Sequence, residues 1–355
     1  MNKTLFLFFI LWTLGTALYP GNGKSIKLNL EKKFSLGQKE IFFESITSVY
    51  EDKTENFYIL DHKAYKVYKF SKNGKMLISF GERGLGPGDF ANPHSVHITP
   101  GGNIAVNEVK NFVSIFDNQG KFLDRIKVAR GLDLNLINNN LFYVWIWTPG
   151  GKQQALVNKN GKILKSFFSV SREAFSINAP DETGRSVMIN NFAGEYTPFL
   201  LFNQYENYSI VAVTNKYEIL LLNRDGKILN KIYRDIKPGI ISQEEKEYFK
   251  NEININRKLP DFAKKIFTRK IPKYKNYFNH ILISGPYLWI FRIKENIVNQ
   301  NSFVPVDLYT INMEFRGSMR IKKIPLFISP KYIYFEETNN QEDLLLVKYK
   351  YSVRF

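Results

Sequence analysis

The sequence contains no cysteine. This absence excludes disulfide bonds, thiol nucleophiles and cysteine-ligated zinc, so the fold must be held by its hydrophobic core. Histidine is scarce as well, and the chain has only His62, His94, His97 and His280. Side chains alternate between the two faces of a strand, so the spacing of three predicts that His94 and His97 point to opposite faces. We therefore expect no metal site and no cofactor.

Acidic residues are outnumbered, with 33 Asp and Glu against 50 Lys and Arg, which gives a net charge of +17. The predicted inner strands offer few carboxylates, mainly Glu44, Glu51 and Asp133, and these form no convergent set for calcium. The nucleophile phrase G-x-S-x-G is also absent. An enzyme is therefore disfavoured, although a hydrolase or lyase with its site at a central channel stays the alternative.

One long apolar run occurs, at Leu5–Leu14, after a charged Lys3 and before the small residues Gly15-Thr16-Ala17. The run is too short to span a bilayer, and the small residues suit a signal peptidase. We therefore predict a signal peptide at 1–17, export to the periplasm or beyond, and no membrane span. The excess positive charge favours anionic partners in general, but a lysine-rich solvated surface explains it better, and export disfavours nucleic acid.

What the chain does contain is a repeated hairpin. Each copy is an apolar strand, a polar turn that ends in Gly-Lys, and a second apolar strand, and the copies lie at Val67–Phe80, Val113–Ile126, Gln154–Phe167 and Ile219–Ile232. The turn glycines supply the positive φ that tight hairpins need. The first two spacings between these glycines, 46 and 41 residues, match a four-stranded propeller blade.

Longer spacings downstream indicate insertions at 171–196 and 235–276, and without them the chain accommodates six blades. The last blade has only three strands of its own. The alternating segment Ile26–Leu36 precedes the first blade and would supply the missing outer strand. The prediction is an all-β, six-bladed β-propeller at 18–355, closed by the N-terminal strand and monomeric.

The second insertion is the one helical region. Ser242 and Glu245 form a capping-box pattern, and Pro260 and Pro272 bound a second short helix. We expect this insertion, which precedes blade five, to be a decoration or a partner surface rather than a lid.

The stretch Gly84-x-Gly86-Pro87-Gly88-Asp89-Phe90-x-x-Pro93 resembles the turn that opens an NHL repeat. The residues Gly101–Asn107 and Val113–Gly120 resemble the rest of that repeat. Asn stands at 107 where the family usually has Asp, and Phe112-Val113 stand where it has Arg-Ile. Ile271–Phe291 looks like the entry to blade five of exported bacterial propellers of this type. The resemblance implies a six-bladed β-propeller and says little about function.

Loops that join the second and third strands of each blade share one face of such a ring, which we call the loop face. We expect contacts with a protein, peptide or glycan partner there, from His62, Asn107, Glu108, Lys110, Asn111 and Trp147. An aromatic side chain beside a turn suits such contacts, although packing between blades is the favoured explanation for Trp147. The predicted function is that of an exported, non-enzymatic binding protein.

Overall fold

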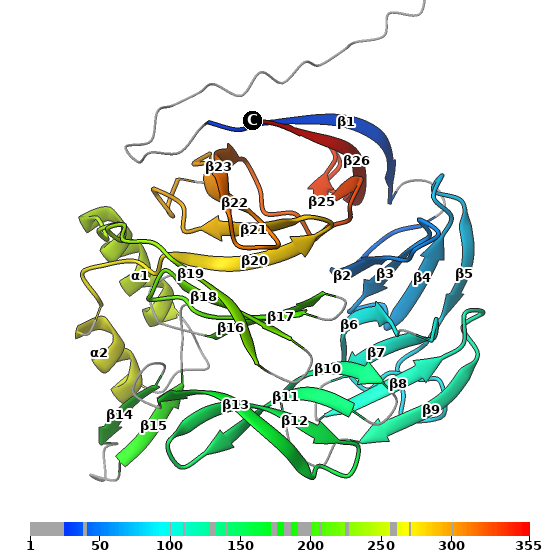
Figure 1. Cartoon of the computed structure of the whole chain (residues 1–355), viewed down its shortest axis with the longest axis horizontal. Helices are drawn as coiled ribbons and strands as arrows, with labels where there is room; N and C mark the ends of the chain where they lie inside the picture. The colour runs from blue at the N-terminus through cyan, green and yellow to red at the C-terminus, as the bar shows by residue number, and fades with distance from the viewer. Residues whose placement is uncertain are drawn as a thin grey trace, which may run out of the picture.

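The computed structural model describes residues 25–37, 41–99, 101–108, 111–127, 132–138, 141–171, 176–180, 186–190, 200–205, 208–223, 227–255, 261–269, 271–299 and 301–355. Six four-stranded antiparallel sheets stand around a ring (Figure 1). The predicted six-bladed propeller is therefore confirmed. The predicted signal peptide lies outside the described residues.

Five blades follow the chain order from the inner to the outer strand. Blade one consists of β2 (Ile46–Glu51), β3 (Phe57–Asp61), β4 (Lys66–Phe70) and β5 (Met76–Phe80). Blade two consists of β6 (Pro93–Ile98), β7 (Ile104–Glu108), β8 (Phe112–Phe116) and β9 (Phe122–Lys127). Blade three consists of β10 (Leu132–Asn138), β11 (Leu141–Thr148), β12 (Gly151–Asn158) and β13 (Ile163–Ser171).

Blade four consists of β16 (Leu200–Tyr205), β17 (Tyr208–Val213), β18 (Glu218–Asn223) and β19 (Ile228–Tyr233). Blade five consists of β20 (Phe278–Ser284), β21 (Tyr287–Arg292), β22 (Val304–Thr310) and β23 (Phe315–Ile321). Between blades three and four the chain adds a separate hairpin of β14 (Ser176–Pro180) and β15 (Ser186–Asn190). The sequence indicated extra residues there but not their structure.

Blade six joins the two ends of the chain. It consists of β24 (Phe327–Ile328), β25 (Tyr332–Thr338), β26 (Leu344–Arg354) and, as its outer strand, β1 (Lys27–Leu36). The strands β1 and β26 run antiparallel, with Leu30 opposite Tyr351 and Leu36 opposite Leu346. The predicted closure by the N-terminal strand is therefore confirmed, and it covers an edge that would otherwise be open to pairing.

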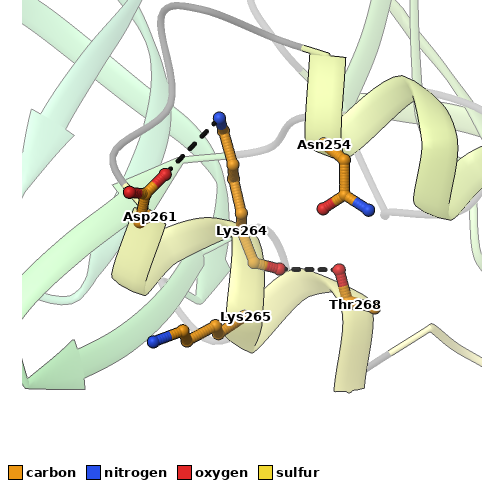
Figure 2. A pocket seen from close by; sticks show the side chains of 5 residues that line it. All are labelled: Asn254, Asp261, Lys264, Lys265 and Thr268. Carbon is orange, nitrogen blue, oxygen red and sulfur yellow. Dashed lines mark hydrogen bonds and ion pairs between the residues drawn. The ribbon is translucent and has the colours of Figure 1, made fainter.

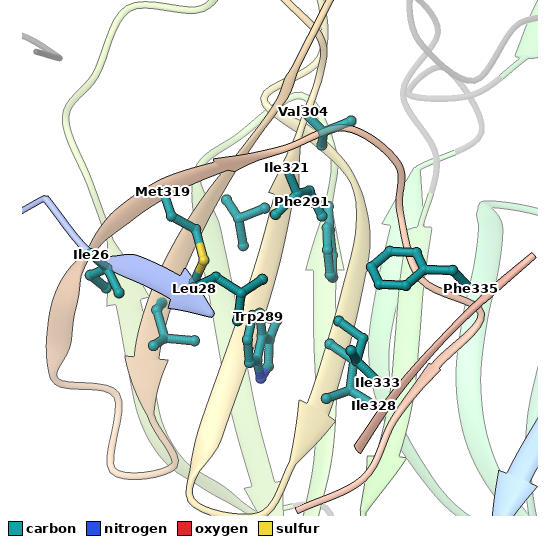
Figure 3. Close-up of a cluster of buried hydrophobic side chains, with 12 residues drawn as sticks. Ile26, Leu28, Trp289, Phe291, Val304, Met319, Ile321, Ile328, Ile333 and Phe335 are labelled. Carbon is teal, nitrogen blue, oxygen red and sulfur yellow. The ribbon is translucent and has the colours of Figure 1, made fainter. Parts of the chain in front are cut away.

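The core is divided among the interfaces between neighbouring blades. Between blades five and six, Leu28 of β1 reaches the same cluster as the fully buried Trp289 of β21 (Figure 3). Between blades one and two, Tyr58 and Val67 pack against Phe90 and Phe116. Large aromatic side chains thus fill the gaps between sheets.

Two helices precede blade five, α1 (Gln243–Ile255) and α2 (Asp261–Arg269). They stand beside the ring, next to blade four and the extra hairpin (Figure 1). The capping box is present, because the Glu245 amide donates to Ser242 Oγ at 3.2 Å and the Ser242 amide donates to Glu245 Oε2 at 2.9 Å. Both helices were predicted, and α1 extends beyond the two turns expected. No helix in the described part of the chain is long and apolar enough to cross a membrane.

Candidate functional site

The loop face carries a cluster of two aromatic rings and one guanidinium where blades one and two meet. His62 and Tyr65 belong to the turn between β3 and β4, and Arg83 belongs to the crossover from β5 to β6. The rings of His62 and Tyr65 are stacked with centroids 6.3 Å apart. The Arg83 guanidinium lies over the Tyr65 ring, 5.6 Å from its centroid. We call these three residues the corner stack.

The tautomer of His62 follows from its hydrogen bond. Its Nδ1 lies 2.6 Å from the carbonyl oxygen of Pro93. A carbonyl oxygen only accepts, so Nδ1 must carry the hydrogen, and in the neutral ring Nε2 is left as an acceptor. The half-buried His62 side chain can therefore accept a hydrogen bond from a partner through Nε2.

The carboxylate of Asp61 fixes the turn beneath the corner stack. It is fully buried and accepts hydrogen bonds from the amides of Glu44 at 2.7 Å, Ser45 at 3.0 Å and Ala64 at 3.2 Å. The His62 amide also donates to the carbonyl of Ser45 at 2.9 Å. These contacts hold the turn in one conformation, which reduces the entropy lost when a partner binds.

The glycine-rich crossover holds Arg83 in place by its backbone. The amide of Gly84 donates to the carbonyl of Phe90 at 3.1 Å, and the Phe90 amide donates to Glu82 at 2.7 Å. Gly81 has a φ of +91°, and a Cβ there would stand 2.1 Å from the buried Phe90 ring. Only glycine fits this position. At the tip of the same crossover Leu85 is 82 % exposed.

Two residues expected at the partner surface point into the protein instead. Asn107 and Glu108 are 5 % and 2 % exposed. Glu108 accepts from the Ala91 amide at 2.7 Å, from Ser114 Oγ at 2.6 Å and from Arg125 Nη2 at 3.0 Å. The Glu108 carboxylate supports the glycine-rich crossover through the Ala91 amide. We therefore leave Asn107 and Glu108 out of the partner surface.

The other predicted contacts are only partly described. Asn111 lies in the turn between β7 and β8 with a φ of +67°, and its side chain is half-buried. Lys110 lies outside the described residues. Trp147 stands opposite Lys152 in the β11–β12 pairing, but the description does not extend to its side chain.

The alternation of side chains along β6 is interrupted at His94. The register shifts at His94, so that Pro93 and Ser95 stand opposite the consecutive residues Glu108 and Asn107. A bulge breaks the alternation, so the expectation of opposite faces does not hold across His94. Burial first and the charge of His94 second lower the pKa of His97 to about 4. His97 is therefore neutral at physiological pH. No group of three or more potential metal ligands occurs among the described residues.

A buried ion pair anchors the helical insertion to blade five. Lys275 and Glu245 are 5 % and 1 % exposed, and Lys275 Nζ lies 2.5 Å from Glu245 Oε1. The same Nζ donates to the carbonyls of Lys294 and Glu295, and the Ile297 amide donates to Glu245 at 2.9 Å. The insertion is therefore anchored to the β21–β22 loop.

We expect this anchor to depend on the charge of Glu245. Burial alone would raise its pKa, but the hydrogen bonds from Lys275 and from two backbone amides outweigh burial and lower the pKa. A depressed pKa gives stability that is present above the unfolded value, near 4.5, and is lost as the pH falls through the folded value. The substitution Glu245→Gln should raise amide hydrogen exchange in α1 about tenfold or more at neutral pH.

The control for this prediction is Glu247→Gln on the same helix. Glu247 pairs with Lys250 at 2.8 Å, but both side chains are exposed, so its loss should hardly change exchange. Equal exchange rates in the two variants would show that the Glu245–Lys275 pair does not anchor the insertion.

A shallow hollow of about 390 Å³ lies between the helices (Figure 2). It is lined by Asn254, Asp261, Lys264, Lys265 and Thr268. Lys264 Nζ lies 3.6 Å from Asp261 Oδ1, and Thr268 Oγ1 donates to the Lys264 carbonyl at 2.8 Å. Because these polar groups largely serve the helix itself, the hollow is a weaker candidate than the corner stack.

Comparison with solved structures supports the propeller fold. A protein of Bacteroides fragilis described as a "putative exported protein" matches with a TM-score of 0.59 and 12% identity, over 93% of this chain and 95% of that one. A member of the DUF4221 family from Bacteroides vulgatus matches with a TM-score of 0.54 and 15% identity, over 93% and 98%. At these identities the likeness shows the fold alone.

More distant is virginiamycin B lyase from Staphylococcus aureus, with a TM-score of 0.42 and 12% identity over 92% of this chain and 99% of that one. A likeness of this size carries no argument about activity. No protein-family model matches the chain, and no curated protein matches it.

Proposed function

We propose that this chain is an exported, non-enzymatic β-propeller that binds a protein, peptide or glycan through its loop face. The observation that carries the proposal is the corner stack, in which the exposed guanidinium of Arg83 on the crossover lies over the Tyr65 ring, which stacks with His62 on a rigid turn. Tyrosine and arginine are among the residues enriched at the hot spots that dominate binding energy in protein interfaces. The exposed Leu85 adds an apolar contact beside them.

Export is part of the proposal. The charged start, the apolar run Leu5–Leu14 and the small residues before position 18 support it. The exported-protein description of the similar Bacteroides fragilis structure agrees with it. Within the same proposal the glycine-rich crossover of blade two is an NHL-type element, supported by its glycines and by Pro87 and Asp89.

The test is binding to peptide and glycan arrays by the chain that begins at residue 18. The double variant Tyr65→Ala/Arg83→Ala should lose at least about tenfold in affinity for whatever the chain binds, because each side chain is a candidate hot spot. The matched control is Tyr233→Ala/Lys53→Ala, which removes an exposed tyrosine and an exposed cation elsewhere. Equal binding by both variants would place the partner surface elsewhere.

A further inference from the structure

The outer strands of the blades share an irregularity at equivalent positions. In blade one Phe70 stands opposite Met76 while Lys69 stands opposite Ile78, so Leu77 has no partner across the pairing. The same shift between the third and outer strands recurs in every blade. The residues left without a cross-strand partner are Leu77, Leu123, Leu164, Leu229, Arg316 and Lys33. A bulge of this kind turns a side chain away from the sheet.

Four of these six bulged residues are leucines, and all four are exposed. Leu77, Leu123, Leu164 and Leu229 are 45 %, 49 %, 48 % and 48 % exposed. We call these four residues the leucine belt. They lie on β5, β9, β13 and β19, the outer strands of four successive blades (Figure 1). Single exposed leucines are common, but a polar residue would serve equally well at a solvent-facing bulge. The same apolar residue in four equivalent places therefore needs a reason other than folding.

Each leucine of the belt has a cation beside it in the sequence. The lysine of the Gly-Lys turn comes two residues earlier, at Lys75, Lys121, Lys162 and Lys227, and all four are exposed. None of the four takes part in an ion pair within the described part of the chain. Each of these four blades thus offers an ammonium group and an apolar side chain together, in a protein whose net charge is +17.

We infer that the leucine belt binds an extended polypeptide that combines apolar and acidic side chains. The lysines select carboxylates, and the leucines select apolar groups. A second copy of this chain is an unfavourable partner, because it would bring like charges together. The bulges also interrupt the strand edge, so the bound segment is not an added strand.

The shape of the surface favours a polypeptide over a membrane. The four outer strands stand around the wall of a ring (Figure 1). A flat bilayer would touch only part of a curved wall at one time, whereas a flexible chain can follow it. Successive turns of an antiparallel blade alternate between its two ends, so the Gly-Lys turns lie at the end opposite the loop face. The belt is therefore a second surface, independent of the corner stack.

The test uses fluorescence anisotropy with a labelled peptide of four Leu-Glu-Ser-Asp repeats. We expect saturable binding that weakens as salt rises, because the lysines contribute charge. The double variant Leu164→Ser/Leu229→Ser should weaken it about tenfold or more. Leu30→Ser is the matched control, since Leu30 is 42 % exposed but lies outside the belt. All variants should unfold at the wild-type temperature, because these sites are exposed.

Several results would overturn the inference. One is the absence of binding to the peptide. A second is equal binding to a peptide in which lysine replaces both acidic residues. Another is unchanged binding by the belt variant. The last is leucine-dependent binding to vesicles of mixed phosphatidylcholine and phosphatidylglycerol, which would assign the belt to a membrane surface. Loss of binding in Tyr65→Ala/Arg83→Ala concerns the loop face alone, so the two proposals fail separately.

Discussion

A chain that begins at residue 37 should not form a stable monomeric fold. Without β1, the edge of β26 is open and the interface between blades five and six loses Ile26 and Leu28, which are 5 % and 7 % exposed in the closed ring. Phe34, stacked on Phe57 with centroids 5.8 Å apart, is lost as well. Burying each such side chain contributes about 1.5–3 kcal/mol, so the loss approaches the whole stability of a domain, about 5–15 kcal/mol. Thermal unfolding measures the loss of stability, and size-exclusion chromatography measures the loss of the monomeric state.

Adding the missing strand back distinguishes a specific loss from general misfolding. A synthetic peptide of residues 25–37 should restore a cooperative unfolding transition, because it can pair with β26 in the native register. The same peptide with Leu28→Asp and Phe34→Asp should not. If the truncated chain unfolds at the same temperature as the complete one, closure by β1 contributes little and the explanation fails.

The second large effect concerns Lys348 of β26, whose side chain is 1 % exposed. Its Nζ lies 3.3 Å from Glu51 Oε2 and 3.9 Å from the centroid of the Tyr332 ring. The rings of Phe57 and Tyr334 also stand within reach, at 5.1 and 5.3 Å. Burial lowers the pKa of Lys348, and Glu51 acts against that shift. The cation thus joins blade six to blade one inside an aromatic cage.

The substitution Lys348→Met should cost about 3–5 kcal/mol in urea unfolding, because it leaves the Glu51 carboxylate buried without its cation. The double variant Lys348→Met/Glu51→Gln should recover at least half of that loss. The control is the pair of Lys323 and Glu336, which has the same 3.3 Å separation but an exposed lysine and a glutamate that is only half-buried. The same single and double substitutions at Lys323 and Glu336 should give a coupling free energy below about 1 kcal/mol. Equal coupling in the two cycles would contradict the role of the cage.

The fold was predictable because its signals are local. Each Gly-Lys turn determines a hairpin, and the regular spacing of Gly74 and Gly120 indicates the blade. The alternation of Ile26–Leu36 and the missing strand of the last blade together predicted the closure. Ser242 and Glu245 indicated the start of a helix for the same reason, because a capping box spans only four residues.

The site was less predictable, because it depends on which way side chains turn in three dimensions. Glu108 stands beside a turn in the sequence, yet Arg125 and Ser114 draw its carboxylate inward. The stacking of Arg83 on Tyr65 joins two blades, and no pattern within either segment indicates it. A register shift at His94 interrupts the strand alternation from which the faces of His94 and His97 were predicted, and similar shifts produced the leucine belt.

Both proposed surfaces depend on a closed ring, because only closure holds the six blades in fixed positions. Because the sequence contains no cysteine, two introduced cysteines can form an intramolecular disulfide only with each other. Asn29 of β1 lies opposite Ser352 of β26, and Asn29 Nδ2 donates to Ser352 Oγ at 3.4 Å. The variant Asn29→Cys/Ser352→Cys should form an intramolecular disulfide on mild oxidation, seen as faster migration on a non-reducing gel. The control Asn29→Cys/Gln341→Cys should not. Free thiols in the folded Asn29→Cys/Ser352→Cys protein would contradict closure by the N-terminal strand.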